Sequence, residues 1–279
     1  AIWSAPAQRL LDFPAESFIR FCDNHGLLKL SDRPQWRTVV GGSRSYVKRL
    51  TRQYADRVRL NRGVRSVQRF ADAVQLTDVT GRIETFDHVV IATHADQALA
   101  LLNDSSPAEA NLLASFRYER NDAYLHTDTA LMPKRRAAWS SWNYLGDRGI
   151  VASQKLCVTY WMNMLQGIET DQPVFLTLNP VRPPRAGTVL HTEIYQHPIF
   201  DSAANLAQRS LWSLQGRNRT WFCGAYFGAG FHEDGLQAGL AVAEALGEVR
   251  RPWTVFNESG RILLDADPVP TLFHTAEAA

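Results

Sequence analysis

The 279-residue sequence has few cysteines and no long apolar run. Its three cysteines, Cys22, Cys157 and Cys223, lie far apart and form no C-x-x-C pair, which argues against a disulfide framework or a zinc site. We therefore expect free thiols and no metal, as in a cytoplasmic protein. No apolar stretch approaches the roughly 18–20 residues that cross a bilayer, and the opening residues lack the features of a signal peptide. These absences predict no transmembrane segment and leave peripheral contact with a membrane open.

The sequence also lacks an excess of charge of either sign. Lysine and arginine number 30 against 28 acidic residues, so the formal net charge is only +2. This balance gives no electrostatic case for a nucleic-acid partner, and the short basic run at residues 133–136 is typical of a solvated loop. With 45% hydrophobic residues, the composition is that of an ordinary globular protein of one or two domains.

The dinucleotide-binding pattern G-x-G-x-x-G is missing as well, and Gly228-Ala229-Gly230 supplies only its first half. That half lies in the stretch FCGAYFGAGFHEDG, residues 222–235, which holds four glycines. An aromatic run precedes this stretch and an alanine-rich run follows it. The pattern therefore predicts a strand, a glycine loop and a helix over residues 235–246, with Asp234 as its N-cap.

Upstream of this stretch, helix and strand signals alternate. Apolar spacing predicts a helix over residues 14–28 that stops near Gly26, and a second helix over residues 43–54 after the Gly41-Gly42 turn. The remaining patterns predict a short strand at residues 38–42 that runs into the Gly41-Gly42 turn, and further strands at 58–60, 64–67 and 74–76. The last two alternate as in a hairpin or meander, for which Thr80-Gly81 supplies the turn. A buried strand at 86–92 and helices ending at about 102 and 116 follow.

Residues 118–192 carry short runs rich in aromatic and β-branched residues, separated by turn signals, which predicts an antiparallel sheet. A predicted helix at residues 203–211 follows. The order is that of an α/β fold interrupted by a β-rich insert, a pattern found in two-domain enzymes. Five aromatic residues of the insert are candidates either for an apolar substrate pocket or for the core of the sheet: Trp139, Trp142, Tyr144, Tyr160 and Trp161.

Two groups of motifs, in this order, resemble the flavin-containing amine oxidase superfamily, which includes phytoene-desaturase-like enzymes. The first group is the Gly41-Gly42 turn with its helix, the strand at Val64, and the strand that ends at Ala92-Thr93. The second group is a strand ending in Gly224-Ala225, followed by a G-x-x-x-G helix start at residues 235–239. The sequence is also similar to a bacterial subgroup of this superfamily known as predicted NAD/FAD-binding proteins.

The resemblance implies an FAD-binding doubly wound fold of the α/β class (α+β overall), incomplete here, with an inserted antiparallel-sheet substrate domain. Because the superfamily opens with a G-x-G-x-x-G unit and this sequence starts at Ala1 without one, we expect a truncated, C-terminal part of a longer protein. The implied domains are a helical part of the substrate domain (1–36), FAD-binding parts (37–106 and 216–250), the substrate domain (107–215) and a tail (251–279).

By the same resemblance, the helix that opens near Gly235 aims backbone N–H groups at the pyrimidine edge of a flavin, where a reduced flavin is negatively charged. A structural glycine turn before a core helix is the alternative. The candidate catalytic residues are His232, as a proton donor or acceptor, and Lys155. Relatives often place a lysine near flavin N5 through a water, and Lys155, in the β insert, is the candidate for that role. The implied FAD-binding residues are Gly41, Gly42, Val64, Ala92, Thr93, Gly224, Ala225, Gly235, Leu236 and Gln237.

The sequence therefore predicts an FAD-dependent oxidoreductase that passes hydride from an apolar or amine small-molecule substrate to flavin N5. Leu236 stands where amine oxidases carry one of two aromatic residues that enclose the amine, which lowers the case for a simple amine. A flavin desaturase or isomerase acting on a lipid-like substrate is one alternative. A truncated, non-catalytic binding module is another, and we expect no activity from this fragment alone.

Overall fold

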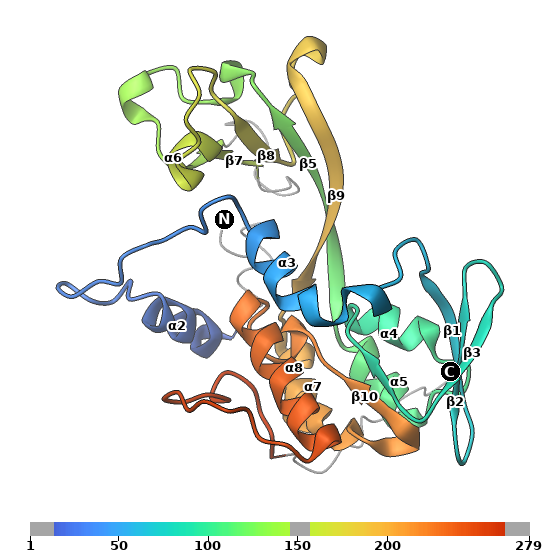
Figure 1. The fold of residues 1–279 in the computed structure, drawn as a ribbon. Coiled ribbons are helices and arrows are strands. Elements are labelled where there is room, and N and C mark those ends of the chain that lie inside the picture. Colours follow the sequence, from blue (N-terminus) through green and yellow to red (C-terminus); the bar gives the residue numbers. More distant parts are fainter. Residues whose placement is uncertain (1–13, 146–156, 266–279) are drawn as a thin grey trace, which may run out of the picture. The chain divides into compact units, whose positions relative to one another are not determined.

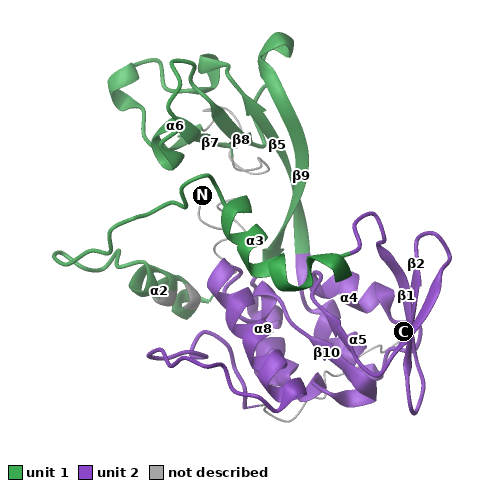
Figure 2. Cartoon of the chain, in the orientation of Figure 1, with its two compact units in different colours: residues 1–58, 118–199 green, residues 59–117, 200–279 purple. Residues whose placement is uncertain are grey.

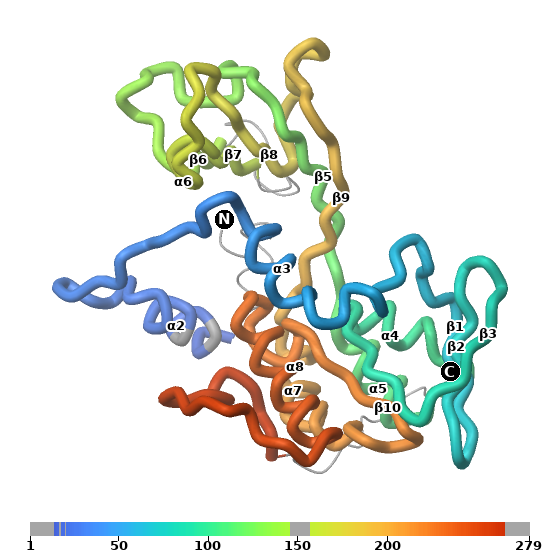
Figure 3. Tube along the Cα trace, viewed as in Figure 1, coloured from blue at the N-terminus to red at the C-terminus, as the bar shows by residue number. Residues whose placement is uncertain are grey.

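The computed structural model describes residues 14–145 and 157–265 (Figure 1). The chain divides into two compact units, each made of two stretches distant in sequence. Unit 1 comprises Ala1–Val58 and Tyr118–Ile199, and unit 2 comprises Arg59–Arg117 and Phe200–Ala279 (Figure 2). The backbone therefore passes between the units three times (Figure 3). No described helix combines the length and the apolar character that a bilayer crossing requires. The predicted domain boundaries stay a prediction.

Unit 1 is built on a five-stranded sheet. Its strands are β5 (Arg117–His126), β6 (Trp142–Leu145), β7 (Cys157–Trp161), β8 (Phe175–Leu178) and β9 (Val189–Ile199). They lie in the order β6-β7-β8-β5-β9. The pairs β6–β7, β7–β8 and β5–β8 are antiparallel, which confirms the sheet predicted from the aromatic and β-branched runs.

A buried chain of hydrogen bonds runs along one face of this sheet. The backbone N–H of Asp128 donates to Nδ1 of His126 at 3.0 Å, so the proton of the neutral ring lies on Nε2. That Nε2 lies 2.7 Å from the hydroxyl of Thr177, which is 2.8 Å from the hydroxyl of Thr159. Thr159 donates to the carbonyl of Leu131 at 3.3 Å. Burial lowers the pKa of His126 and outweighs the opposing charge of Asp128, so the ring is held neutral.

The helices of unit 1 are short. Helix α2 (Ala15–Asn24) ends where predicted, and Gly26 follows it with φ +62°. The predicted turn at Gly41-Gly42 is confirmed, with φ of +79° and +76° and the N–H of Gly42 donating to the carbonyl of Val39. The strand predicted to lead into it is wrong, because residues 38–40 pair with no described strand. The other helices are α3 (Arg44–Thr51), η1 (Arg52–Arg57), η2 (Thr129–Leu131), η3 (Arg136–Ala138), α6 (Met162–Gln166) and η4 (Ala186–Thr188).

Unit 2 contains two small sheets, of which the first is an antiparallel meander of β1 (Val64–Arg69), β2 (Val74–Asp78) and β3 (Ile83–Phe86). The Asp78 carboxylate closes the β2–β3 turn by accepting the hydroxyl of Thr80 at 2.6 Å and the N–H groups of Thr80 and Arg82. These hydrogen bonds, that of the Thr80 hydroxyl first, lower the pKa of Asp78 to about 2. The meander and its turn at Gly81 confirm the prediction, whereas residues 58–60 form no strand.

The second sheet of unit 2 pairs β4 (Val89–Ile91) with β10 (Thr220–Phe222) in parallel. This strand pair confirms the predicted strands at residues 86–92 and 220–223, although both are shorter than predicted. The helices of unit 2 are α4 (Ala95–Leu101), α5 (Pro107–Ala114), α7 (Ser202–Leu211), η5 (Trp212–Leu214), η6 (Arg217–Arg219), η7 (Ala225–Phe227) and α8 (His232–Gly247).

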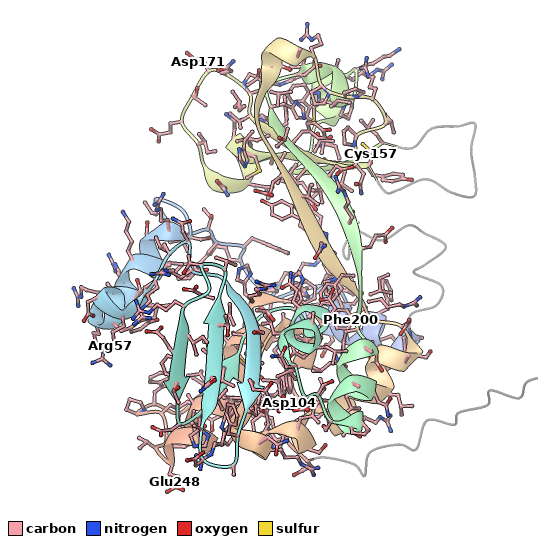
Figure 4. The ribbon with its side chains drawn as sticks, turned by 90° about the vertical axis from the view of Figure 1, so that its right-hand side faces the viewer. Arg57, Asp104, Cys157, Asp171, Phe200 and Glu248 are labelled. Carbon is pink, nitrogen blue, oxygen red and sulfur yellow. The ribbon has the colours of Figure 1, made fainter. Side chains whose placement is uncertain are left out.

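A buried ion pair joins the meander to α5. Nη1 of Arg69 donates to Glu109 at 2.5 Å, and Nε donates to Asp104 at 2.9 Å. Asp104, which is labelled in Figure 4, lies in the turn between α4 and α5. Glu109 also accepts the N–H of Ser106 at 2.7 Å, as in a capping box. Burial raises the pKa of Glu109, but the hydrogen bonds from Arg69 and Ser106 outweigh it and hold the pKa below its ordinary value. The carboxylate therefore stays charged inside unit 2.

Candidate functional site

The two parallel strands of unit 2 end at the same edge of their sheet. Strand β4 is followed by Ala92 and Thr93, which are exposed, and β10 is followed by Cys223 and Gly224. The N–H of Cys223 donates to the carbonyl of Ile91 at 3.1 Å, so the pairing continues to the point where both segments turn away. Ligands of α/β proteins commonly bind at this edge, where the following helices begin.

Gly224 makes the turn out of β10. Its backbone has φ +156° and ψ +171°, a conformation that residues with a side chain rarely adopt. A Cβ at this position would lie 2.8 Å from Cε1 of Tyr226 and 3.6 Å from the carbonyl oxygen of Thr93. The backbone conformation of this turn and its packing against the Tyr226 ring therefore depend on glycine, whereas the distance to Thr93 is that of an ordinary contact.

Helix α8 begins at His232, three residues earlier than predicted, and its first turns pack on this loop. A Cβ on Gly235 would lie 3.6 Å from the backbone nitrogen of Ala225, which is an ordinary contact distance. Four of the predicted cofactor residues therefore lie together in one cluster, which we call the strand-end cluster. Its members are Thr93, Gly224, Ala225 and Gly235.

The loop between β10 and α8 is held by Asp234, which sequence reasoning placed at the N-cap. The structure puts Asp234 inside the first turn of α8, where it is buried. Its Oδ2 accepts the N–H groups of Ala229 at 3.1 Å and Phe231 at 2.7 Å, and Nε of Arg261 donates to its Oδ1 at 2.6 Å. A Cβ on Gly228 would lie 2.7 Å from this carboxyl group, so the glycine leaves the space that Asp234 occupies. Asp234 therefore folds back over the loop that precedes it.

Two glutamines also support the site and were not predicted. Nε2 of Gln208, on α7, donates to the carbonyls of Tyr226 at 2.9 Å and Gly228 at 2.6 Å. The amide of Gln215 donates to the carbonyl of Phe222 at 2.7 Å and accepts its N–H at 2.8 Å. No sequence signal identifies these glutamines, or Arg261, because only the tertiary structure brings them to the loop.

The N-terminus of α8 combines the positive end of a 16-residue helix with two acidic residues, Glu233 and Asp234. Arg261 offsets the charge of Asp234 directly, and Glu233 is exposed and accepts Nε2 of Gln237 at 2.9 Å. The positive end of the helix is therefore only partly opposed by acidic charge. His232, the first residue of α8, is exposed, and Leu236 is 54% exposed.

The other predicted site residues are not brought to the strand-end cluster by any described contact. Gln237 is buried, and its side-chain Oε1 accepts the backbone N–H of Arg261 at 3.0 Å. Val64 opens β1 in the other sheet, Gly41 and Gly42 belong to unit 1, and Lys155 lies outside the described residues. The described part of the chain holds no group of three potential metal ligands.

The predicted aromatic group of unit 1 is divided between the two faces of the sheet. Trp142 and Tyr160 are paired across β6 and β7 with ring centroids 5.7 Å apart, and Tyr144 shares their face. Trp161 follows Tyr160 in β7 and so points to the opposite face, where it contacts Trp139 at 5.4 Å. That second group also packs on Phe175 of the core and carries the guanidinium of Arg136 at 4.0 Å from the Trp139 ring centroid. The five aromatics therefore do not line one surface.

No curated protein matches the chain. Among solved structures, wild-type putrescine oxidase bound to putrescine is similar, with 11% identity, coverage of 75% of this chain and 53% of that chain, and a TM-score of 0.51. Cyclohexylamine oxidase from Brevibacterium oxydans has 13% identity, coverage of 74% and 52%, and a TM-score of 0.47. A CLA-producing fatty acid isomerase from P. acnes has 11% identity, coverage of 66% and 47%, and a TM-score of 0.46. The chain spans about half the length of these structures.

At such low identity the likeness to putrescine oxidase shows the fold alone, and the family is shown by the sequence. Residues 8–152 match the family described as flavin containing amine oxidoreductase. The matched segment includes the Gly41-Gly42 turn, Val64 and Ala92-Thr93, and it ends before β10. Because it covers more than half of the 279 residues, the chain belongs to the flavin-containing amine oxidoreductase family.

Proposed function

We propose that this chain is part of an FAD-dependent oxidoreductase, and that the strand-end cluster and the first turns of α8 hold the flavin. One observation carries this proposal. Two parallel strands end together, a turn with a glycine-only conformation follows one of them, and a long helix begins on that turn. Membership of a flavin-containing family makes flavin the expected ligand of such an edge.

The residues at this edge fit one side of a flavin. The N–H groups of Asp234 and Gly235 already donate to the carbonyl of Phe231, at 3.1 and 3.2 Å. The N-terminus of α8 therefore offers the N–H groups of His232 and Glu233 and a partial positive charge, which suit the acceptor-rich pyrimidine edge. Ala92 and Thr93 are exposed at the end of β4, and Leu236 exposes an apolar side chain. Arg261 partly neutralises the buried carboxylate of Asp234, which reduces its repulsion of a negatively charged ligand.

A bound flavin supplies a hydride acceptor at N5. In this proposal the chain binds the pyrimidine edge with the backbone of the first turns of α8, while Asp234 fixes the loop. The imidazole of His232 accepts or returns a proton at a ring nitrogen, which its exposed position at the start of α8 permits. The proposed substrate is an apolar or amine small molecule, and the leucine at position 236 favours the apolar class.

The test measures FAD binding, by visible absorption, to the longest natural polypeptide that carries this sequence. Leu236→Asp is compared with Leu206→Asp, which adds the same charge to a leucine of α7 that is 42% exposed. A carboxylate beside the α8 N-terminus repels the pyrimidine edge and competes for the N–H groups. We expect Leu236→Asp to raise the Kd of FAD about tenfold, equivalent to about 1.4 kcal/mol, and Leu206→Asp to leave it unchanged.

Absence of flavin bands after adding FAD to the unaltered polypeptide would overturn the proposal. Equal weakening by both substitutions would place the flavin away from α8 and would overturn the assigned site while leaving the family assignment intact.

A further inference from the structure

Positive charge is concentrated in one helical segment of unit 1. Residues 44–57, which form α3 and η1, contain five basic residues and a single acid, Asp56, for a net charge of +4. Because the whole chain carries +2, the other 265 residues together carry a net charge of −2. The basic residues are Arg44, Lys48, Arg49, Arg52 and Arg57.

Apolar and basic side chains lie on different sides of α3. At about 100° per residue, Tyr46, Val47 and Leu50 project from one side of the helix. Arg44 and Lys48 project from the opposite side. A helix with one apolar and one basic face is typical of segments that lie on a membrane surface or bind a partner.

Neither face of this segment is covered within the described structure. No residue of α3 or η1 is buried, and the three apolar side chains of α3 are 36–66% exposed. None of the five basic side chains forms an ion pair with a described residue. Just beyond the segment, by contrast, Arg59 pairs with Glu84 and Arg62 pairs with Asp78. The segment with five exposed basic side chains thus ends at Arg57 (Figure 4).

We propose that α3 and η1 bind the surface of an anionic lipid bilayer, with the apolar side of α3 at the boundary of headgroups and acyl chains. Charge complementarity selects this partner, because anionic headgroups attract basic residues near the surface. The apolar side argues against nucleic acid, since phosphates would engage the basic side and leave Leu50 in water. Two short turns of helix bury little apolar area, so binding is reversible and requires both faces.

The test is co-sedimentation of the 279-residue chain with vesicles of equal parts phosphatidylserine and phosphatidylcholine, and with vesicles of phosphatidylcholine alone. The first variant combines Lys48→Gln, Arg49→Gln and Arg52→Gln. Its matched control combines Lys134→Gln, Arg135→Gln and Arg209→Gln, which removes the same charge from exposed positions elsewhere. A second variant, Leu50→Ser, alters the apolar face alone. Circular dichroism establishes that each variant is folded.

We expect binding to the anionic vesicles only. Each cation near the surface contributes about a fivefold change in affinity, so the first variant should bind about a hundredfold more weakly. The control loses the same charge at positions away from the proposed surface, where salt screens it, so its affinity should fall much less. Leu50→Ser weakens binding in high salt, where the apolar contact carries more of the affinity. Equal binding to both vesicles, equal loss in variant and control, or no vesicle binding at all would each overturn the proposal.

Discussion

Substituting Asp234 with alanine tests how the loop between β10 and α8 is held. The carboxylate is 1% exposed and takes three hydrogen bonds, from the N–H groups of Ala229 and Phe231 and from Arg261. Leaving a buried donor without an acceptor costs about 1–3 kcal/mol, and breaking a buried ion pair costs about 3–5 kcal/mol. Because the side chain of Arg261 is 18% exposed and reaches water, we expect about 3–4 kcal/mol in total.

Asp234→Asn separates the two contributions. Its carbonyl oxygen still accepts the N–H groups of Ala229 and Phe231, but the amide replaces the oxygen that binds Arg261. We expect a loss of about 1–2 kcal/mol, since only the charge-assisted bond is removed. Arg250→Met serves as the control, because Arg250 is 60% exposed in its ion pairs and should contribute less than about 1 kcal/mol.

Urea unfolding gives these free energies, and hydrogen exchange at the amides of Ala229 and Phe231 reports the loop directly. Protection of both amides should fall in Asp234→Ala and persist in Asp234→Asn. The reasoning is refuted if the two substitutions cost the same, or if Asp234→Ala costs no more than Arg250→Met.

Two further predictions concern backbone conformation and pH. Gly224→Ala should cost about 2–4 kcal/mol, because its φ of +156° is strained for alanine and its Cβ meets the Tyr226 ring; Gly239→Ala, with open space around it in α8, should instead stabilise by about 0.5–1 kcal/mol in the same urea assay. Burial lowers the folded-state pKa of His126, so its contribution is complete above the unfolded value of about 6.5 and is lost as pH falls toward the folded pKa. The free energy of unfolding should therefore fall between pH 7.5 and 5.5, and this fall should be smaller in His126→Gln; equal slopes would contradict the assignment.

Local patterns predicted the elements whose signals lie within a few residues. Alternation and a turn at Gly81 were enough for the β1–β3 meander, and the positive φ of Gly26 agrees with the predicted end of α2. The strand predicted ahead of the Gly41-Gly42 turn failed for a non-local reason, since a strand needs a pairing partner and no described strand pairs with residues 38–40. Apolar, β-branched residues alone do not distinguish the two outcomes.

The sequence predicted the strand–loop–helix order of the candidate site, but not the side chains that hold its loop in place. The strand–loop–helix order is visible in the glycine spacing, whereas the family resemblance was needed to join Thr93 to it. The start of α8 was misplaced because Asp234, a good N-cap residue, bonds backward to Phe231 from within the first turn. Gln208 and Arg261 reach the loop from 20 residues before and 27 residues after their bonding partners, so no local signal marks them.

The hydrogen bonds of Gln215 determine which edge of the small parallel sheet of unit 2 can accept another strand. The Gln215 amide pairs with both polar groups of Phe222, and the N–H of Gly216 donates to the carbonyl of Thr220 at 3.0 Å. A side chain and a turn thus occupy the outer border of β10 as a neighbouring strand would. Because these backbone groups of Phe222 and Thr220 are already hydrogen-bonded, an added strand cannot pair with them. A strand added to this sheet must therefore pair with β4, and a peptide designed to extend the sheet should be matched to β4.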